Sequence, residues 1–337
     1  VMNPYQFVMY NYERQALRGA SAIRGFEERY GAYGDLDLYK YQQGHNWQEE
    51  MFDNSDLSQS HNISITGGSE KTKFTLSGTY ANDNSLMENN GYRRYNMNFK
   101  LKHELYKNLS LDFGARLADT ETKGVGTGGG SYKIRSYDAL MKAPVNGLYD
   151  QIDIDPSTLP EEEYEEYVNA TRSLKDQVND YWRRKNERRY NFNAAINWNI
   201  TKNFTYRAEG GYDYTFFQQK DWYGPRSSKA VQDGQGLPMG EWEKKDSWKL
   251  RAAHTLTWKQ KFNKIHDVNI MVGQEYVASN SESNEIIGKF FQEDITPEKM
   301  FASMAANSGA TGSRTISSQL GQEDRTISFF GRANYSL

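Results

Sequence analysis

The sequence predicts an all-β protein, namely an antiparallel up-and-down β-barrel that crosses a membrane with its strands. Three observations support this prediction. Apolar and polar residues alternate over long stretches, short and long connections alternate between those stretches, and the composition suits one apolar face better than a large soluble core. Only 37% of the 337 residues are hydrophobic, while 14% are aromatic, with 24 tyrosines. No apolar run approaches the roughly 20 residues of a transmembrane helix.

The stretch RRYNMNFKLKHEL, residues 93–105, shows the alternation most clearly. From Tyr95 to Leu105 every odd position is apolar except His103, and every even position from Arg94 to Glu104 is polar. Successive side chains of a strand point to opposite faces, so this period of two predicts a ribbon with one apolar and one polar face. Its length is about twice that of an ordinary strand.

The pattern recurs along the chain and predicts nine strands, at residues 62–66, 73–80, 94–105, 109–117, 190–200, 204–216, 248–258, 268–276 and 327–337. Short turns are expected at 67–72, 106–108, 201–203 and 261–266, and longer connections at 81–93, 120–187, 217–247 and 280–326. Long extracellular loops on one rim and short periplasmic turns on the other are typical of outer-membrane barrels. A soluble, elongated antiparallel sheet with one covered face remains the alternative.

The two faces of the predicted strands carry different residues. Aromatic residues towards the strand ends on the apolar face are expected to form girdles at the lipid interface: Tyr95, Tyr190, Trp198, Phe204, Tyr214, Trp248, Trp258 and Tyr276. Residues expected to face a hydrated lumen are Arg94, Lys100, Asp112, Arg116, Arg207, Glu209, Asp213, Lys249 and Arg251. His254 falls on the apolar face by strict alternation, which is costly within a membrane, and the doublet Ala252–Ala253 suggests a bulge that changes its face.

The first part of the chain reads differently from the rest. Asn3 as N-cap, Pro4 at the first helical position and Gln6 completing a capping box predict a helix that Gly19 ends. The following residues, up to about 60, are polar and rich in glycine and tyrosine, so we expect irregular structure with one short strand pair. We therefore divide the chain into a helical or irregular segment, 1–60, and a barrel segment, 61–337.

The predicted strand count has a consequence of its own. Bacterial barrels have an even number of strands, and the alternation continues into the last residues, YSL. An open sheet edge in lipid leaves backbone groups without partners. We therefore expect the chain to be the N-terminal part of a larger barrel. The C-terminal strands of that barrel, and a domain that precedes it, are expected to lie outside this sequence.

Several motifs resemble one protein family. HNISITGGSEKTKFTLSGTY (61–80), followed by GYRRYNMNF (91–99), resembles the start of the barrel in the SusC/RagA-like TonB-dependent transporters of Bacteroidetes. FFGRANYSL (329–337) is similar to a mid-barrel strand of that family, and NPYQFVMYNYERQALR (3–18) to its helical segment between plug and barrel. The resemblance covers the chain from end to end, although the intervening loops show no detailed match.

The resemblance implies an outer-membrane importer of oligosaccharides or peptides, with no enzymatic activity and no cofactor. A SusD-like surface lipoprotein is the implied lid. The TonB–ExbB–ExbD complex is the implied source of energy, acting through a plug domain that this sequence does not contain. The alternative is an outer-membrane adhesin or a glycan-binding structural β-protein without transport.

Three further segments suggest ligands. The cluster WRRKNERR (182–189) suits either lipopolysaccharide phosphates or a solvated strand entry. Asp150, Asp153 and Asp155 offer carboxylates for calcium, although the spacing departs from an EF-hand and TLPE resembles a capping box. Loop aromatics suited to stacking on sugar rings, to contact with a lid protein, or to packing within the loops are Tyr181, Trp182, Trp222, Tyr223 and Trp242.

Other classes of function find no support in the sequence. Zero cysteines exclude disulfides, thiol catalysis and cysteine-bound zinc, and a net charge of −3 gives no signal for nucleic acid. The five histidines lack metal-binding spacing, and GVGTGGGS (124–131) lacks the Lys-Ser/Thr ending of a phosphate-binding loop.

Overall fold

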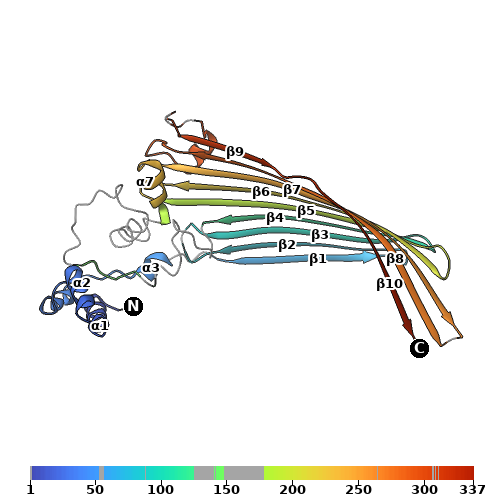
Figure 1. Cartoon of the computed structure of the whole chain (residues 1–337), viewed down its shortest axis with the longest axis horizontal. Coiled ribbons are helices and arrows are strands. Elements are labelled where there is room, and N and C mark those ends of the chain that lie inside the picture. The colour runs from blue at the N-terminus through green and yellow to red at the C-terminus, as the bar shows by residue number, and fades with distance from the viewer. Residues whose placement is uncertain are drawn as a thin grey trace.

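A computed structural model describes residues 2–52, 57–87, 89–124, 140, 142–147, 178–263, 265–305, 307, 309 and 311–337. One antiparallel sheet of ten strands dominates this part of the chain (Figure 1). Neighbouring strands from β1 to β8 follow chain order, and β8 then pairs with both β9 and β10. The predicted all-β, up-and-down architecture is therefore confirmed, and among the described strands the sheet is not closed.

The strands have the following bounds: β1 Gln59–Gly68, β2 Thr72–Asn84, β3 Gly91–Tyr106, β4 Leu109–Lys123, β5 Tyr181–Asn199, β6 Phe204–Tyr223, β7 Met239–Phe262, β8 His266–Gly288, β9 Arg314–Leu320 and β10 Asp324–Ser336. The helices are α1 Pro4–Ala16, α2 Ala20–Tyr30, the 3-10 helix η1 Tyr33–Lys40, α3 Trp47–Met51, α7 Ser228–Gly234 and α8 Pro297–Ala302. Among the described residues, no helix combines the length and apolar character needed to cross a membrane.

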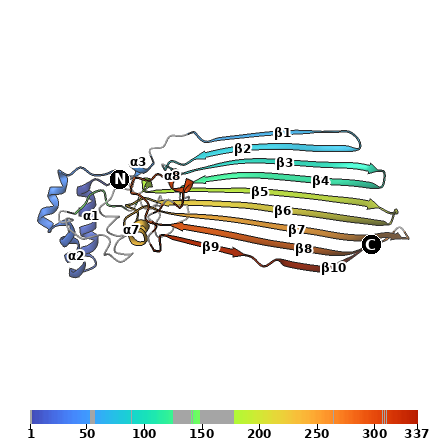
Figure 2. The ribbon, with the colours of Figure 1, turned by 90° about the horizontal axis from the view of Figure 1, so that it is seen from above.

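The connections sort by length as predicted. Tight connections join β1 to β2, β3 to β4, β5 to β6 and β7 to β8 at one end of the sheet, and the longer connections lie at the other end (Figure 2). We call these the short-turn rim and the long-loop rim. All nine predicted strands are present.

The expected lengths of the loops were wrong, because β5 to β8 continue well past the alternating region. Strand structure includes 181–187 in β5, 217–223 in β6, 239–247 in β7 and 280–288 in β8, all of which we expected in long loops. At the ends of these extensions nearest the rim, protein packs on both faces, for example at Trp222 and Tyr223, so apolar and polar residues no longer need to alternate there. Strand β9 was also missed; its residues are exposed, and it pairs with the part of β8 nearest the long-loop rim, next to β10 in the line of the sheet (Figure 2).

Helix α1 confirms its sequence signature. The Asn3 side chain accepts a hydrogen bond from the Gln6 backbone N–H at 2.8 Å, and the Gln6 side chain accepts one from the Asn3 N–H at 3.2 Å. The expectation of irregular structure and a strand pair in the next 40 residues was wrong, because α2, η1 and α3 occupy most of that segment. Phe26 and Tyr30 are four residues apart on α2, and packing on α1 stabilises a helix that its own sequence signals only weakly.

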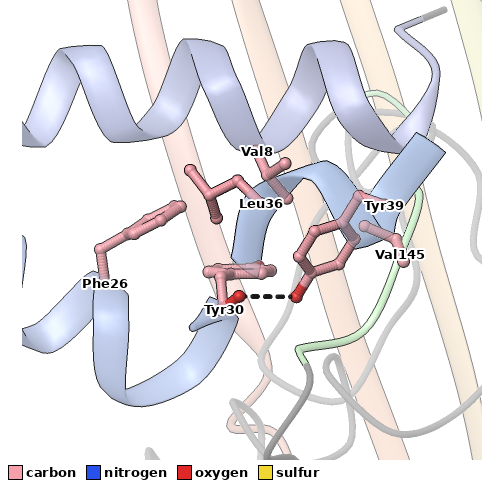
Figure 3. Close-up of a cluster of buried hydrophobic side chains, with 6 residues drawn as sticks. All are labelled: Val8, Phe26, Tyr30, Leu36, Tyr39 and Val145. Atoms are coloured by element: carbon pink, nitrogen blue, oxygen red, sulfur yellow. Dashed lines mark hydrogen bonds between the residues drawn. The ribbon is translucent and has the colours of Figure 1, made fainter. Parts of the chain in front are cut away.

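The helices enclose a small core of their own (Figure 3). It consists of Val8, Phe26, Tyr30, Leu36, Tyr39 and Val145, and the Tyr39 hydroxyl donates a hydrogen bond of 3.0 Å to the Tyr30 carbonyl. Val145 comes from the connection between β4 and β5, and in the same connection the Ala143 carbonyl accepts a 2.7 Å hydrogen bond from Trp47 Nε1. The helices are thereby attached to a connection of the long-loop rim.

Within the described part of the chain, no second layer covers the middle of the sheet. Large apolar side chains there are half exposed, for example Tyr95 at 50% and Ile196 at 43%, and the described clusters of buried apolar residues involve the helices and the long-loop rim. The sheet therefore presents a wide apolar surface that no described part of the chain covers.

His254 lies on that apolar surface, and the suggested bulge at Ala252–Ala253 is absent. The register of β6 with β7 runs without a shift through Gly210–Ala252, Glu209–Ala253 and Ala208–His254. Instead, His254 Nδ1 and the Tyr206 hydroxyl are hydrogen-bonded at 2.6 Å, with their rings stacked. A partner on the neighbouring strand thus satisfies the polar group without moving it to the other face.

We predict that Leu36→Ala loosens the helical core, because Leu36 is only 1% exposed. The expected loss is about 2–5 kcal/mol of local stability, the usual cost of such a cavity. Leu38→Ala, two residues away in η1 and 52% exposed, is the matched control and should cost no more than about 0.5 kcal/mol. Amide hydrogen exchange in α1 and α2 measures both; equal exchange in the two variants would contradict the packing described.

We also predict that Tyr206→Phe destabilises the sheet by about 1–3 kcal/mol, because it leaves the His254 imidazole unpaired on an apolar surface. Tyr212→Phe is the control, since Tyr212 lies on the same face of β6 and shows no side-chain hydrogen bond among the described residues. Urea unfolding of the whole protein in detergent compares the two. The explanation fails if both substitutions cost the same.

Candidate functional site

The register of the strands divides the sheet into two faces, because directly opposed residues share a face. Lys100 lies opposite Gly114, Gly114 opposite Asn193, Asn193 opposite Gly211, and Gly211 opposite Arg251. Followed in this way, the residues predicted to line the lumen all lie on one face: Arg94, Lys100, Asp112, Arg116, Arg207, Glu209, Asp213, Lys249 and Arg251. We call this the polar face.

Part of the polar face is a network of ion pairs across β4 to β8. Arg207 lies between Asp112, at 3.6 Å, and Glu209, at 2.9 Å. Arg251 pairs with Glu209 at 3.0 Å and with Glu275 of the next strand. Each arginine thus has a carboxylate on either side, and both arginines in this region are neutralised by ion pairs.

Amide side chains extend the network. Asn197 donates a 2.8 Å hydrogen bond to Asp112 and accepts one of 2.6 Å from Arg207. Asn191 donates a hydrogen bond to Asp213. Sequence reasoning did not single out Glu275 and the asparagines, although each occupies the polar phase of its strand. The alternation alone gives their face but not their partners.

The other face carries the predicted aromatic girdle. Tyr190, Tyr214 and Trp248 are opposed across β5, β6 and β7, and form one row towards the long-loop rim. A second row near the short turns includes Phe204 opposite Trp258, with Trp198 close by on β5. Eight residues separate Tyr190 from Trp198, and ten separate Trp248 from Trp258.

The two remaining girdle residues follow the same pattern with a shift. Tyr95 in β3 lies one row closer to the long-loop rim than Tyr190, whereas Tyr276 in β8 lies two rows further from that rim. Strands of a barrel tilt by about 35–45°, so a level membrane surface crosses successive strands at shifting rows. The observed drift has this form. That the apolar face contacts lipid stays a prediction.

Above the upper aromatic row, the apolar face changes to a cluster of cations. Arg184 lies opposite Lys220, and the Lys220 and Lys244 ammonium groups lie 4.6 and 4.3 Å from the centre of the Trp242 ring. Burial, together with the charges of Lys244 and Arg184, lowers the pKa of Lys220. The segment WRRKNERR is thus divided by strand parity, with Trp182, Arg184 and Arg188 on this face and Arg183 and Arg189 on the polar face.

The aromatics expected in loops lie in strands, which corrects that prediction: Tyr181 and Trp182 in β5, Trp222 and Tyr223 in β6, and Trp242 in β7. They pack at the long-loop rim. Trp222, Trp182 and Trp242 join a cluster with Phe291, Met300, Phe301 and Met304, whereas Tyr181 and Tyr223 pack with Ala230 and Met239. Their burial favours the interpretation as packing residues.

A buried carboxylate, Asp221, stabilises this region and was missed by sequence reasoning. It is 3% exposed, pairs with Arg183, and accepts hydrogen bonds from the Tyr181 hydroxyl and from Gln219 Nε2. Burial and the neighbouring Asp221 raise the pKa of Tyr181, so this phenol stays protonated as a donor. The group therefore organises structure and offers no chemistry of its own.

The calcium candidates Asp150, Asp153 and Asp155 lie outside the described residues. Within the described part of the chain, no three His, Cys, Asp or Glu side chains are grouped so that they could hold a metal ion. The candidate site is therefore the polar face itself, together with the cation cluster on the opposite face.

Comparison with known proteins gives a consistent result. No family model matches the chain. It is 22% identical over 307 residues to TonB-dependent receptor P3 of Formosa agariphila, which covers 86% of this chain and 27% of that protein. Two solved structures, titled the RagAB peptide transporter and the RagAB peptide importer in its "closed-closed" state, match with TM-scores of 0.69 and 0.67 at 15% and 16% identity.

Both structural matches cover 99% of this chain and 38% of the other. The chain thus spans about a quarter of the curated relative and well under half of the solved transporters. The described strands of this chain have the same fold as a segment of those transporters. The resemblance drawn from the sequence is confirmed as a similarity: the chain is similar to a TonB-dependent receptor, and its strands share the fold of part of the RagAB β-barrel.

Proposed function

We propose that this chain contributes the wall of an outer-membrane barrel that imports a bulky polar nutrient, either an oligosaccharide or a peptide, in a TonB-dependent manner. One observation carries the proposal: a single sheet has a continuous apolar face bounded by aromatic rows and an opposite face lined with charges. A soluble protein would cover the apolar face with a second layer, and the described residues provide none.

A complete barrel requires more strands than the structure describes. Strands β1 and β10 each pair with one neighbour, and an unpaired edge is not tolerated in lipid. We infer that residues 61–337 join further strands on both sides. The helices of the first 60 residues lie at the long-loop rim, which would place them on the outer side of the membrane (Figure 1). Their role as a connection from a plug domain stays a prediction.

The partners follow from the same proposal. The curated relative is named a TonB-dependent receptor, and the solved structures are titled as the RagAB peptide transporter and the RagAB peptide importer. We propose that energy comes from TonB–ExbB–ExbD through a plug, and that a SusD-like lipoprotein closes the long-loop rim. The helical core and the covered strand ends give that rim the rigidity that a docking surface needs.

We also propose that the cation cluster on the apolar face binds lipopolysaccharide phosphates. Lys244 is exposed and lies four residues beyond Trp248 along β7, roughly 13 Å at the usual rise of a strand. This distance places the charge at the level of the lipid headgroups if the aromatic row marks the interface. Burial, and after it the charges of Lys244 and Arg184, lowers the pKa of Lys220, so three cations lie close together at this level.

The transport proposal predicts uptake that depends on both the protein and TonB. Cells of the native organism, intact or lacking either gene, are given fluorescent peptide and oligosaccharide mixtures. Uptake of one class should fall by at least about tenfold in both deletions. Retention of both activities would refute the proposal, and the class that is lost identifies the substrate.

Thiol labelling controls for correct insertion, since this chain has no cysteine of its own. Asp294→Cys, on the long-loop rim, should react with an impermeant maleimide on intact cells. Glu70→Cys, in a short turn, should react only after lysis. The reverse labelling would show that the proposed orientation is wrong.

The lipopolysaccharide proposal predicts a difference between two adjacent lysines. Lys244→Gln removes a charge from the apolar face and should weaken lipopolysaccharide binding about fivefold, since one cation near an anionic membrane surface contributes about 1 kcal/mol. Lys245→Gln removes the same charge from the polar face and should leave binding unchanged. Native mass spectrometry of the protein titrated with lipopolysaccharide distinguishes them, and equal binding by both variants would exclude the site.

A further inference from the structure

The polar face carries its charges unevenly. On β2, β3 and β4 it presents four exposed cations, Lys73, Lys100, Lys102 and Arg116, which line a common groove. Within the described part of the chain, none of the four forms an ion pair or a side-chain hydrogen bond. This differs from the other half of the same face, where Arg207 and Arg251 are each paired twice.

The single carboxylate in the groove does not neutralise these cations. Asp112 belongs to its lining, but its carboxylate accepts a hydrogen bond from Asn197 and pairs with Arg207. It is therefore engaged by β5 and β6, although Lys102 lies directly opposite it on β3. Glu104 lies further along the polar face of β3 and is not part of the lining.

The groove has the size and polarity of a binding site. Its volume is about 470 Å³, within the range of small-ligand sites. Its wall adds the polar side chains of Asn98, Asn193, Thr66 and Thr75 to the four cations. The floor is low at Gly114, where a Cβ would lie 2.4 Å from Asn193 Oδ1, so the absence of a side chain lets Asn193 lie across the strand.

We propose that this groove binds the anionic groups of the transported substrate, so that the substrate class is a polymer bearing carboxylates or sulfates. The inference rests on the proposed transport function and adds a charge to the nutrient. Three lysine ammonium groups and one arginine guanidinium around a groove attract anions from several directions, and their flexible stems suit groups spaced along a polymer better than one fixed geometry.

The observations favour a transient substrate over a permanent partner. A permanent acidic partner would need a fixed set of pairs, as in the network of β4 to β8, where arginine and carboxylate alternate at hydrogen-bonding distances. The groove instead has three lysines and one arginine, all exposed. Weak, screened contacts of this kind allow a charged polymer to bind and then to leave.

The test uses the whole purified protein in detergent and two labelled probes, hexa-aspartate and hexagalacturonate, with hexa-asparagine and maltohexaose as neutral counterparts. Both anionic probes carry carboxylates, so the stronger binder tells whether the substrate is a peptide or a glycan. We expect the neutral probes to bind at least about tenfold more weakly. The preference should diminish when salt is raised, because exposed charges are screened.

A pair of double variants locates the site. Lys100→Gln with Lys102→Gln should weaken binding of the anionic probe about tenfold. Lys245→Gln with Lys261→Gln removes two exposed lysines from the same face in β7 and should change binding less than about twofold. Equal losses in both variants would mean a general effect of lumen charge and would overturn the assignment.

Two other results would also overturn it. The first is that the anionic probes do not bind at all. The second is that the groove variant lowers the melting temperature but leaves binding unchanged, which would show that another part of the protein occupies the groove. Failure here is distinguishable from failure of the transport proposal. The binding assay needs no energy source, whereas the uptake experiment responds to TonB whether the substrate is charged or neutral.

Discussion

Pairing of the backbone along one continuous ladder is the constraint on which the rest of this structure depends. Each of β2 to β8 has its N–H and C=O groups engaged by strands on both sides, so the middle of the sheet needs no water and no second layer to satisfy its backbone. The period of two then separates the side chains into an apolar and a polar face without any further folding information. Register maintains that separation from strand to strand, and His254, a polar residue on the apolar face, is satisfied by a hydrogen bond with Tyr206.

How much of this can be predicted from sequence depends on whether a segment has two different environments. The central parts of the strands, such as 94–105 and 190–200, have apolar surroundings on one face and polar surroundings on the other, so the alternation of their residues reveals them. The strand extensions end at the long-loop rim in residues that pack against protein on both faces, where alternation is not required, and we expected loops there. Helix α2 was missed because its stability comes from Phe26 and Tyr30 packing on other helices, which a local pattern does not encode.

Candidate site residues divide in the same way. Parity places Arg94, Lys100 and Arg251 on the correct face, because a face is a property of one strand. Pairing is a property of two or more strands. Whether Asp112 serves Lys100 on β3 or Arg207 on β6 is decided by register and by the reach of each side chain, and the structure shows that it serves Arg207. The contrast between a neutralised and a cationic half of the polar face arises only at this level.

At the long-loop rim the ends of the strands no longer separate an apolar from a polar environment, because protein packs on both of their faces. On the apolar face, the connection after β8 and α8 cover Trp222 and Trp242 with Phe291, Met300 and Phe301. On the polar face, Ala230 of α7 packs against Tyr181, Tyr223 and Met239, the first residue of β7.

Met300 and Phe291 can lie close to the strands on the apolar face because two opposed strand residues, Gly240 and Gly288, are glycines. A Cβ on Gly240 would lie 2.1 Å from Met300 Cε, and one on Gly288 would lie 2.8 Å from the Phe291 ring. Covered on both sides, the strand ends behave as the centre of a small three-layer sandwich. The long-loop rim is consequently a packed extension of the sheet, and it can position a ligand or a partner with the precision of the strands themselves.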